Sequence, residues 1–252
     1  MVQLTEIETL TLLISRELRD GDRVHVGANQ DLVLNAVALA HDTRGILVNL
    51  TAVGGRWFGA PERAVGLPTY SRATVEAFDA PLDQERAFDD LQRPPIVFAG
   101  GLQVDRTGNV NLIGIGRDGQ SWKVRGPGSA GLPSLTGLSD TYFAYVAKHD
   151  PKTLVESVEF VSAVGSPRLR RELGLPTVTR GAVLTPLCRF AWDGDFLVVT
   201  HRVPGISIDE LRARTPFDLN LEPAPPYIDP LSETELAWLE QTARAITANE
   251  RA

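Results

Sequence analysis

The sequence has a single cysteine, Cys188, in 252 residues, so one chain can form neither an internal disulfide nor a thiolate metal site. Histidine is also scarce: there are four, and no two have the spacing of metal ligands, so we expect no metal centre. Acidic residues outnumber basic ones, 32 to 25, which gives a net charge of −7. A nucleic-acid-binding protein needs a basic face, so this balance argues against one. The negative net charge does not exclude one anion-binding pocket built from a few arginines.

Long apolar runs are also missing. No stretch of 18 apolar residues occurs, so we expect no membrane span. The first 22 residues lack the basic start and apolar centre of a signal peptide. They are instead typical of an amphipathic helix, in which Thr5 and Glu8 have the spacing of a capping box. These features lead us to expect a cytoplasmic protein.

Strand-like and helix-like segments alternate along the first part of the chain. A short strand is predicted at 23–27, an amphipathic helix at 32–41 and a nearly continuous apolar strand at 45–50. A continuous apolar run is typical of a strand that is covered on both faces. The alternation predicts an α/β fold, with one domain over 1–252 built on a mostly parallel, helix-covered sheet.

The middle of the chain is rich in predicted strands, and its last part combines a hairpin with helices. Strands are expected at 94–101 and 109–116, and a hairpin is expected about the turn 193–195. Ser207 and Ser232 each precede a glutamate by three residues, which indicates the starts of two helices. We expect residues from about 218 to 252 to form a proline-rich surface strap and a final helix.

Two glycine-rich loops follow predicted strands, "AGGLQVDRTGNVN" at 99–111 and "GPGSAGLPSL" at 126–135. Glycine pairs often mark only tight turns, and neither loop fits a dinucleotide-binding or Walker A pattern. Two such loops at one sheet can also bring backbone N–H groups together, where they can line the carbonyl oxygen of a thioester. The candidate substrate- or CoA-binding residues in these loops are Gly100, Gly101, Gly126, Gly128, Ser129 and Gly131.

The segments "VFAGGLQVDRTGNVNLIGI" and "KVRGPGSAGLPSLTG" together resemble the β-subunit half of the class I coenzyme A transferases. The segment from Ala182 to Leu219 resembles the same family, with Pro204-Gly205 and 215–217 at the positions of its later motifs. The resemblance covers about residues 5 to 220 and implies the class I CoA-transferase fold. One departure lies in the second loop, where Ser129 and Ala130 replace the usual glycine pair.

A second departure concerns the catalytic residue. The resemblance implies a catalytic glutamate just after the second strand, yet this sequence has no Asp or Glu from Thr43 to Pro61. Glu62 comes about ten residues too late to replace it. The chain therefore cannot supply a carboxylate nucleophile where the family has one, and we expect no catalytic residue in this chain.

Three interpretations follow. In the first, the chain is a β subunit whose catalytic glutamate lies on a homologous α subunit, as in the actinobacterial family members that hydrolytically open the last steroid ring of a cyclic CoA thioester. The 250-residue length and the stretch "NLTAVGGRWFG" resemble the β chain of that group most closely. In the second, it belongs to a heteromeric transferase that moves CoA between acids. In the third, it is a non-catalytic acyl-CoA-binding scaffold.

The resemblance also implies partners. It implies an α subunit in an α2β2 heterotetramer and an acyl-CoA substrate. No separate cofactor is implied, since CoA is part of the substrate.

Several single residues have two interpretations each. Asn29 follows the first strand and suits either a helix N-cap or a substrate contact. Arg56 and Trp57 lie near the place of the missing glutamate, where the arginine could pair with a substrate carboxylate and the tryptophan could shape a pocket. The alternative is a surface arginine beside a packing tryptophan.

The remaining polar candidates are in or beside the glycine loops. Asp105 precedes a Thr-Gly turn, which indicates a structural, turn-capping carboxylate. Lys123 and Arg125 could bind the CoA phosphates or could be solvated surface charges. His25 and His149 have no partner pattern in the sequence.

Overall fold

The computed structural model describes residues 4–27, 30–52, 55–59, 72–81, 96–118, 121–129 and 131–248. The chain divides into two compact units, one formed by 1–96 with 229–252 and the other by 97–228. In the described part of the chain, no helix is both long and apolar enough to cross a bilayer.

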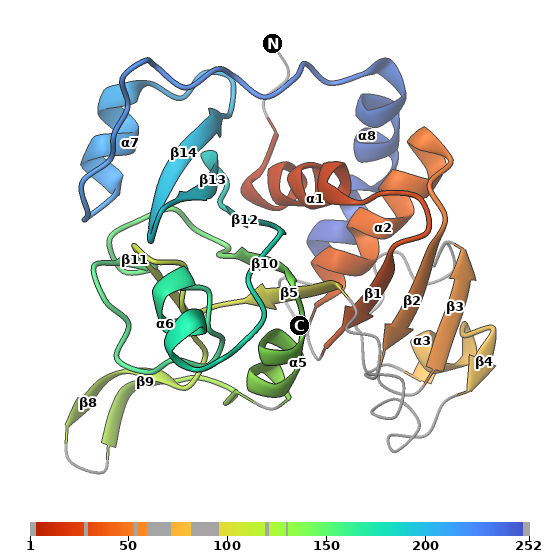
Figure 1. Cartoon of the computed structure of the whole chain (residues 1–252). Coiled ribbons are helices and arrows are strands. Elements are labelled where there is room, and N and C mark those ends of the chain that lie inside the picture. Colours follow the sequence, from red (N-terminus) through yellow and green to blue (C-terminus); the bar gives the residue numbers. More distant parts are fainter. Residues whose placement is uncertain are drawn as a thin grey trace. The chain divides into compact units, whose positions relative to one another are not determined.

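The first unit combines a small sheet with a group of helices (Figure 1). Its helices are α1 (Glu6–Glu17), α2 (Asp31–Arg44), α3 (Arg72–Glu76) and α8 (Glu233–Ala248). Its strands are β1 (Arg23–Val26), β2 (Val48–Ala52), β3 (Gly55–Gly59) and β4 (Ala80–Pro81). The strands follow one another in the order β1-β2-β3-β4, with β1 parallel to β2 and the later pairs antiparallel.

Sequence features explain where these elements begin and end. The predicted capping box is present, because Thr5 accepts the Glu8 N–H while the Glu8 carboxylate accepts the Thr5 N–H. Helix α2 ends at Gly45, whose φ of 67° is the left-handed conformation that glycine favours. Strand β2 differs from the prediction: it begins at Val48, and Asn49 is exposed between buried Val48 and Leu50. The expectation that both of its faces are covered was therefore wrong.

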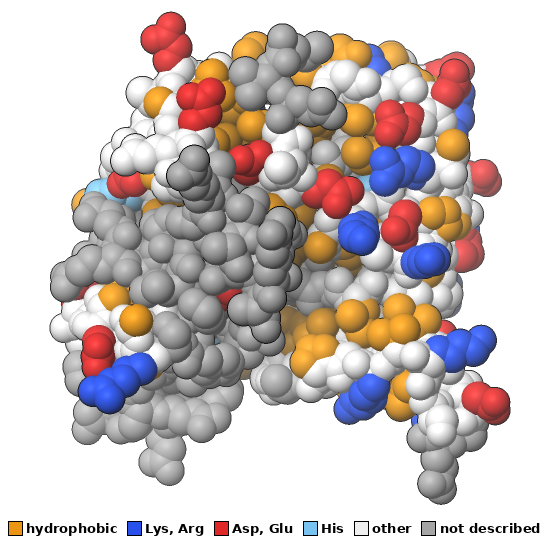
Figure 2. All heavy atoms as spheres, turned by 180° about the vertical axis from the view of Figure 1, so that it is seen from behind, with side chains coloured by type: hydrophobic (Ala, Val, Ile, Leu, Met, Phe, Trp, Pro, Cys, Tyr) orange, Lys and Arg blue, Asp and Glu red, His pale blue; other side chains and the backbone are white. Residues whose placement is uncertain are grey.

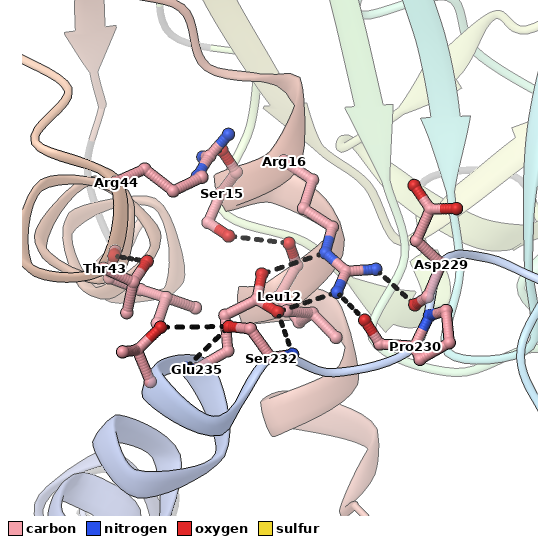
Figure 3. Close-up of polar contacts among 11 residues, drawn as sticks. Leu12, Ser15, Arg16, Thr43, Arg44, Asp229, Pro230, Ser232 and Glu235 are labelled. Carbon is pink, nitrogen blue, oxygen red and sulfur yellow. Dashed lines mark hydrogen bonds and ion pairs between the residues drawn. The ribbon is translucent and has the colours of Figure 1, made fainter.

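Helix α8 is joined to α1 by a partly buried ion pair (Figure 3). The Arg16 guanidinium donates to both Glu235 carboxylate oxygens, at 3.0 and 2.8 Å, and to the carbonyls of Asp229 and Pro230. Burial alone would raise the pKa of Glu235, but hydrogen bonds from Arg16 and Ser232 hold it below the usual value. The C-terminal helix thus returns to the first helix of the chain.

The second unit contains a larger sheet with the strand order β14-β13-β12-β10-β5. These strands are β5 (Ile96–Gly100), β10 (Thr141–Tyr145), β12 (Arg180–Leu184), β13 (Cys188–Asp193) and β14 (Phe196–Arg202). The pairs β5–β10 and β10–β12 are parallel, and β12–β13 and β13–β14 are antiparallel. Phe98 and Phe143 are paired across β5 and β10 and stack at 5.1 Å in its core. The α/β class and the predicted hairpin about 193–195 are confirmed; the extent of the domain stays a prediction.

Shorter elements complete this unit (Figure 1). The strands β6 (Gln103–Asp105), β7 (Val110–Asn111) and β11 (Leu154–Val155) form one small sheet, and β8 (Gly114–Asp118) and β9 (Ser121–Arg125) form a two-stranded hairpin. The helices are α5 (Leu132–Leu138), α6 (Pro167–Glu172) and α7 (Ile208–Arg214). The prediction of one strand over 109–116 was wrong, because Asn111 turns the chain by accepting the N–H groups of Ile113 and Gly114. The expected strap lies along β14, since Ile228 donates its N–H to the Arg202 carbonyl.

Candidate functional site

The first glycine loop is held in place by a buried carboxylate. Asp105 is 3% exposed, and its Oδ1 accepts the N–H groups of Thr107 and Asn109 at 2.9 and 3.1 Å. It also accepts the Thr107 hydroxyl at 2.7 Å, while Oδ2 accepts the Asn109 side-chain amide at 3.2 Å. This confirms the interpretation of Asp105 as a turn-capping residue.

Two asparagines of the same motif connect the loop to the rest of the unit. The Asn109 side-chain oxygen accepts the N–H groups of Gly165 and Ser166, at 3.1 and 3.0 Å. The Asn111 side-chain amide donates to Gln103 and to the Gly114 carbonyl, at 3.0 and 2.8 Å. Both asparagines are buried, so the "QVDRTGNVN" motif is a scaffold whose polar groups bond to one another.

The structure brings the second glycine loop against Leu112 and Ile113, the two residues that directly follow the first loop. Gly126 donates its N–H to the Ile113 carbonyl at 2.9 Å, and Gly128 donates its N–H to the Leu112 carbonyl at 3.1 Å. A Cβ on Gly126 would lie 2.4 Å from that Leu112 carbonyl oxygen. Glycine at 126 is therefore required by the close approach of the first loop.

Three of the six candidate residues in the glycine loops already use their backbone N–H groups within the fold. Besides Gly126 and Gly128, Gly101 donates its N–H to the Tyr145 carbonyl at 3.0 Å. Among the described residues, the N–H groups of Ser129 and Gly131 have no hydrogen-bond partner. The predicted thioester contact stays a prediction, and Ser129 and Gly131 offer backbone N–H groups for it.

The glycines of the site differ in the reason for their presence. A Cβ on Gly100 would lie 2.8 Å from the Tyr145 hydroxyl, and one on Gly101 would lie 2.7 Å from Val110. Gly128 has a φ of 99°, and no described residue lies within 4 Å of its Cβ position, so the backbone conformation is what demands glycine there. Among the described residues, the space beside Gly128 is open.

No family model matches the sequence. The chain is 30% identical over 217 residues to the β subunit of the 3-oxoadipate CoA-transferase of Pseudomonas knackmussii, a match that covers 82% of this chain and 81% of that protein. The chain belongs to the CoA-transferase β-subunit family. It is also 30% identical over 135 residues to the β subunit of the glutaconate CoA-transferase of Acidaminococcus fermentans, covering 51% of this chain and 50% of that protein.

Solved structures confirm the CoA-transferase fold of this β subunit. The glutaconate CoA-transferase of Acidaminococcus fermentans has a TM-score of 0.81 at 20% identity, with 97% of each chain covered. The decarboxylase AibA/AibB has a TM-score of 0.77 at 21% identity, covering 96% of this chain and 95% of that chain. IpdAB of Rhodococcus jostii RHA1 has a TM-score of 0.71 at 19% identity, covering 95% and 94%. Both transferase relatives are single subunits of larger enzymes, and the decarboxylase is named as a pair of proteins.

The other candidates of this β subunit lie in its first unit. Trp57 is 2% exposed, donates its indole N–H to the Ala77 carbonyl at 3.0 Å and packs its ring 4.0 Å from that of Phe78. These contacts favour packing as its role. Arg56 is next to it in β3, opposite Thr51 of β2. The N-cap of α2 is Gln30, so the N-cap interpretation of Asn29 is not supported, and Asn29 itself lies outside the described residues.

The two basic residues before the second loop differ in their contacts. Arg125 donates to the carbonyls of Ile113 and Gly126, so its guanidinium is used to hold the loop. Lys123 is exposed on β9. On the face shown in Figure 2, the described Lys and Arg side chains are interspersed with Asp and Glu. CoA-phosphate binding by Lys123 and Arg125 stays a prediction.

Sequence reasoning missed Arg170, a fully buried arginine behind the second loop. Its guanidinium donates to four backbone carbonyls: those of Pro176 and Thr136 at 2.7 and 3.0 Å, and those of Val164 and Ser139 at 2.8 and 2.6 Å. Burial lowers the pKa of Arg170. Because Thr136 and Ser139 lie in and just after α5, Arg170 fixes the helix that follows the loop.

His149 is a second buried group that the sequence did not reveal. Its Nδ1 lies 2.8 Å from the Thr185 hydroxyl and its Nε2 lies 2.9 Å from the Thr215 hydroxyl. Burial is the largest cause that lowers its pKa, to about 4, and nearby Arg214 lowers it further, while Asp150 opposes the shift. A neutral imidazole held between two hydroxyls is a structural link, and it anchors the 215–217 motif to the sheet.

Proposed function

We propose that this β subunit belongs to a two-subunit enzyme that opens the last ring of a steroid-derived cyclic CoA thioester by hydrolytic C–C cleavage. In this proposal the catalytic carboxylate lies on a homologous α subunit. The observation that carries it is the absence of any Asp or Glu from Thr43 to Pro61, the segment where the transferase pattern requires a glutamate.

The described part of that segment supports the proposal. Strands β2 and β3 are paired antiparallel from Val48 opposite Gly59 to Ala52 opposite Gly55. Along this hairpin the polar side chains of the described residues are those of Asn49, Thr51 and Arg56. A covalent acyl–CoA intermediate needs a carboxylate nucleophile, and none of these side chains is one.

Hydrolytic cleavage requires no nucleophile from this chain. A general base on the α subunit removes a proton from water, and the water oxygen bonds to the ring ketone carbon. The C–C bond between that carbon and the thioester α-carbon then breaks, and its electron pair forms the enolate of the thioester. Protonation of the α-carbon completes the reaction, leaving a new carboxylate and an intact CoA thioester. Backbone N–H groups of the second glycine loop would stabilise the enolate oxygen.

A true CoA transferase is the second candidate function. It is favoured by the 30% identity to the β subunit of the 3-oxoadipate CoA-transferase of Pseudomonas knackmussii. That reaction would need a covalent glutamyl–CoA thioester on the partner and a second carboxylic acid as acceptor. The fold is compatible with both ring cleavage and CoA transfer, since enzymes of different activity, a decarboxylase and a transferase, share it.

The two candidates differ in their products. We suggest incubating the co-purified two-subunit complex with a cyclic steroid-derived CoA thioester in ¹⁸O-labelled water, without an acceptor acid. The proposal predicts a product that has gained one labelled water and retains CoA. Turnover that appears only after a second acid is added, with CoA on that acid, would establish the transferase instead. The single chain without its partner is the control and is expected to be inactive.

A further inference from the structure

Ser162 links the two glycine loops. Its hydroxyl oxygen accepts the Leu112 N–H at 2.9 Å and the Ser129 hydroxyl at 2.8 Å. Leu112 in turn accepts the Gly128 N–H at 3.1 Å. We call these three hydrogen bonds, among Leu112, Gly128, Ser129 and Ser162, the serine clasp. The clasp closes a ring of contacts between the first and the second loop.

The clasp is built on a rigid base. Ser162 is 1% exposed, and its N–H donates to the Val110 carbonyl at 2.7 Å. Ala163, the next residue, forms an antiparallel bridge with Val110 of β7. A side chain fixed in this way holds its hydroxyl in one place, so the position of Ser129 depends on Ser162.

The clasp acts on the part of the second loop that is open. Nothing lies within 4 Å of the Cβ position of Gly128, and the Ser129 N–H has no partner among the described residues. The hydrogen bond to Ser162 fixes the Ser129 side chain and, through it, the peptide group between Gly128 and Ser129. That peptide group carries the N–H that remains available to a ligand.

We propose that Ser162 is a positioning residue, which acts through Ser129 to hold the Ser129 N–H in place for the substrate thioester or enolate oxygen. The inference rests on the proposed function in one respect, namely that the second loop faces the CoA thioester. A serine at 129, where the family resemblance has glycine, gives this loop a side-chain tether. The tether orients a donor and supplies no chemistry of its own.

A double-mutant cycle tests this role. Ser162→Ala, Ser129→Ala and the double variant are compared in the co-purified complex, using any CoA-thioester reaction it performs, hydrolysis or transfer. We expect each single variant to lower kcat about tenfold to a hundredfold, with KM changed less than about threefold. The double variant should lose no more than the larger single loss, since both changes break one tether. Multiplied losses in the double variant, or a rise in KM at unchanged kcat, would overturn the inference.

Ser166→Ala is the matched control. Ser166 is buried on the same segment, but its hydroxyl accepts the Leu169 N–H at the start of α6 and does not touch the loop. It should lower stability without changing kcat. A loss of kcat equal to that of Ser162→Ala would show that a general loosening of the segment explains the effect, and would overturn the inference.

Amide hydrogen exchange tests the clasp without any substrate. Ser162→Ala should speed exchange of the Leu112 and Gly128 amides roughly fivefold to tenfold, the range for loss of one hydrogen bond, while Ser166→Ala should leave both unchanged. Unchanged exchange in Ser162→Ala would overturn the inference even if ring cleavage is found. Conversely, the complex could fail to open the ring and instead transfer CoA, with the expected amide exchange and the expected kcat losses in the variants. That result would refute only the proposed function.

Discussion

Removing the buried guanidinium of Arg170 should destabilise the second unit strongly. Hydrogen bonds from a charged donor contribute about 1.5–3 kcal/mol each, so the four bonds to Pro176, Thr136, Val164 and Ser139 are worth about 6–12 kcal/mol before the cost of burying the charge. That desolvation offsets several kcal/mol of this gain. For Arg170→Met we therefore expect the free energy of unfolding to fall by about 3–5 kcal/mol.

A neighbouring arginine provides the control. Arg171 pairs with Asp195 at 2.9 Å, but its side chain is 60% exposed, so Arg171→Met should cost less than about 1 kcal/mol. Arg170→Lys should fall between the two, because an ammonium group cannot reach four carbonyls on three segments. The planar fork of the arginine is what the site requires.

Urea unfolding, followed by tryptophan fluorescence and far-UV circular dichroism, measures the difference. With a slope of about 2–3 kcal/mol per molar urea, Arg170→Met should lower the unfolding midpoint by about 1–2.5 M, and Arg171→Met by less than about 0.5 M. Equal midpoints for the two variants would refute the claim that Arg170 holds α5 in place.

Three further predictions concern the loops and the buried histidine. Gly128→Val and Gly174→Val should destabilise the chain similarly, because both glycines have positive φ (99° and 68°) and open space among the described residues. Only Gly128→Val should reduce turnover of the complex. Equal turnover of the two variants would show that the second loop is only a structural turn. Gly165→Ala should lower the free energy of unfolding in urea by about 3 kcal/mol, because its Cβ would lie 1.9 Å from a backbone oxygen. Gly137→Ala, whose Cβ would lie 3.8 Å from its nearest described neighbour, should be neutral or stabilising. The folded-state pKa of His149, about 4, lies below its ordinary value of 6.5. As the pH falls, the unfolded chain therefore binds a proton at this residue before the folded chain does, and stability is lost between pH 6.5 and 4. From pH 7 to pH 5 the wild type should lose about 2 kcal/mol more stability than His149→Gln, which lacks the titrating imidazole. A pH-independent gap between the two proteins would contradict this.

The sequence predicted the parts of the site whose signals are local. The capping role of Asp105 could be read because its partners lie two and four residues away. The second glycine loop could be read because glycine and proline restrict the backbone directly. A contact between the second loop and the first could be expected only because both loops follow predicted strands.

Side-chain contacts with residues far away in the sequence could not be predicted. Arg170 binds carbonyls 31 and 34 residues away, and a carbonyl has no side-chain signature. The partners of His149 are threonines 36 and 66 residues away, and they are common residues. The strand expected at 109–116 failed for a related reason: the alternation of residues was strand-like, but the Asn111 side chain captured the N–H groups of the next turn.

The central claim of this account is that the reaction's nucleophile is not in this chain, and intact-mass spectrometry of the separated subunits tests it directly. The complex is mixed with excess CoA thioester, quenched within one turnover, and each subunit is weighed. We predict that this β subunit keeps its own mass at every time point, because its β2–β3 hairpin has no carboxylate nucleophile in the described residues. A transient gain by this β subunit of the mass of CoA or of the acyl group would contradict the claim.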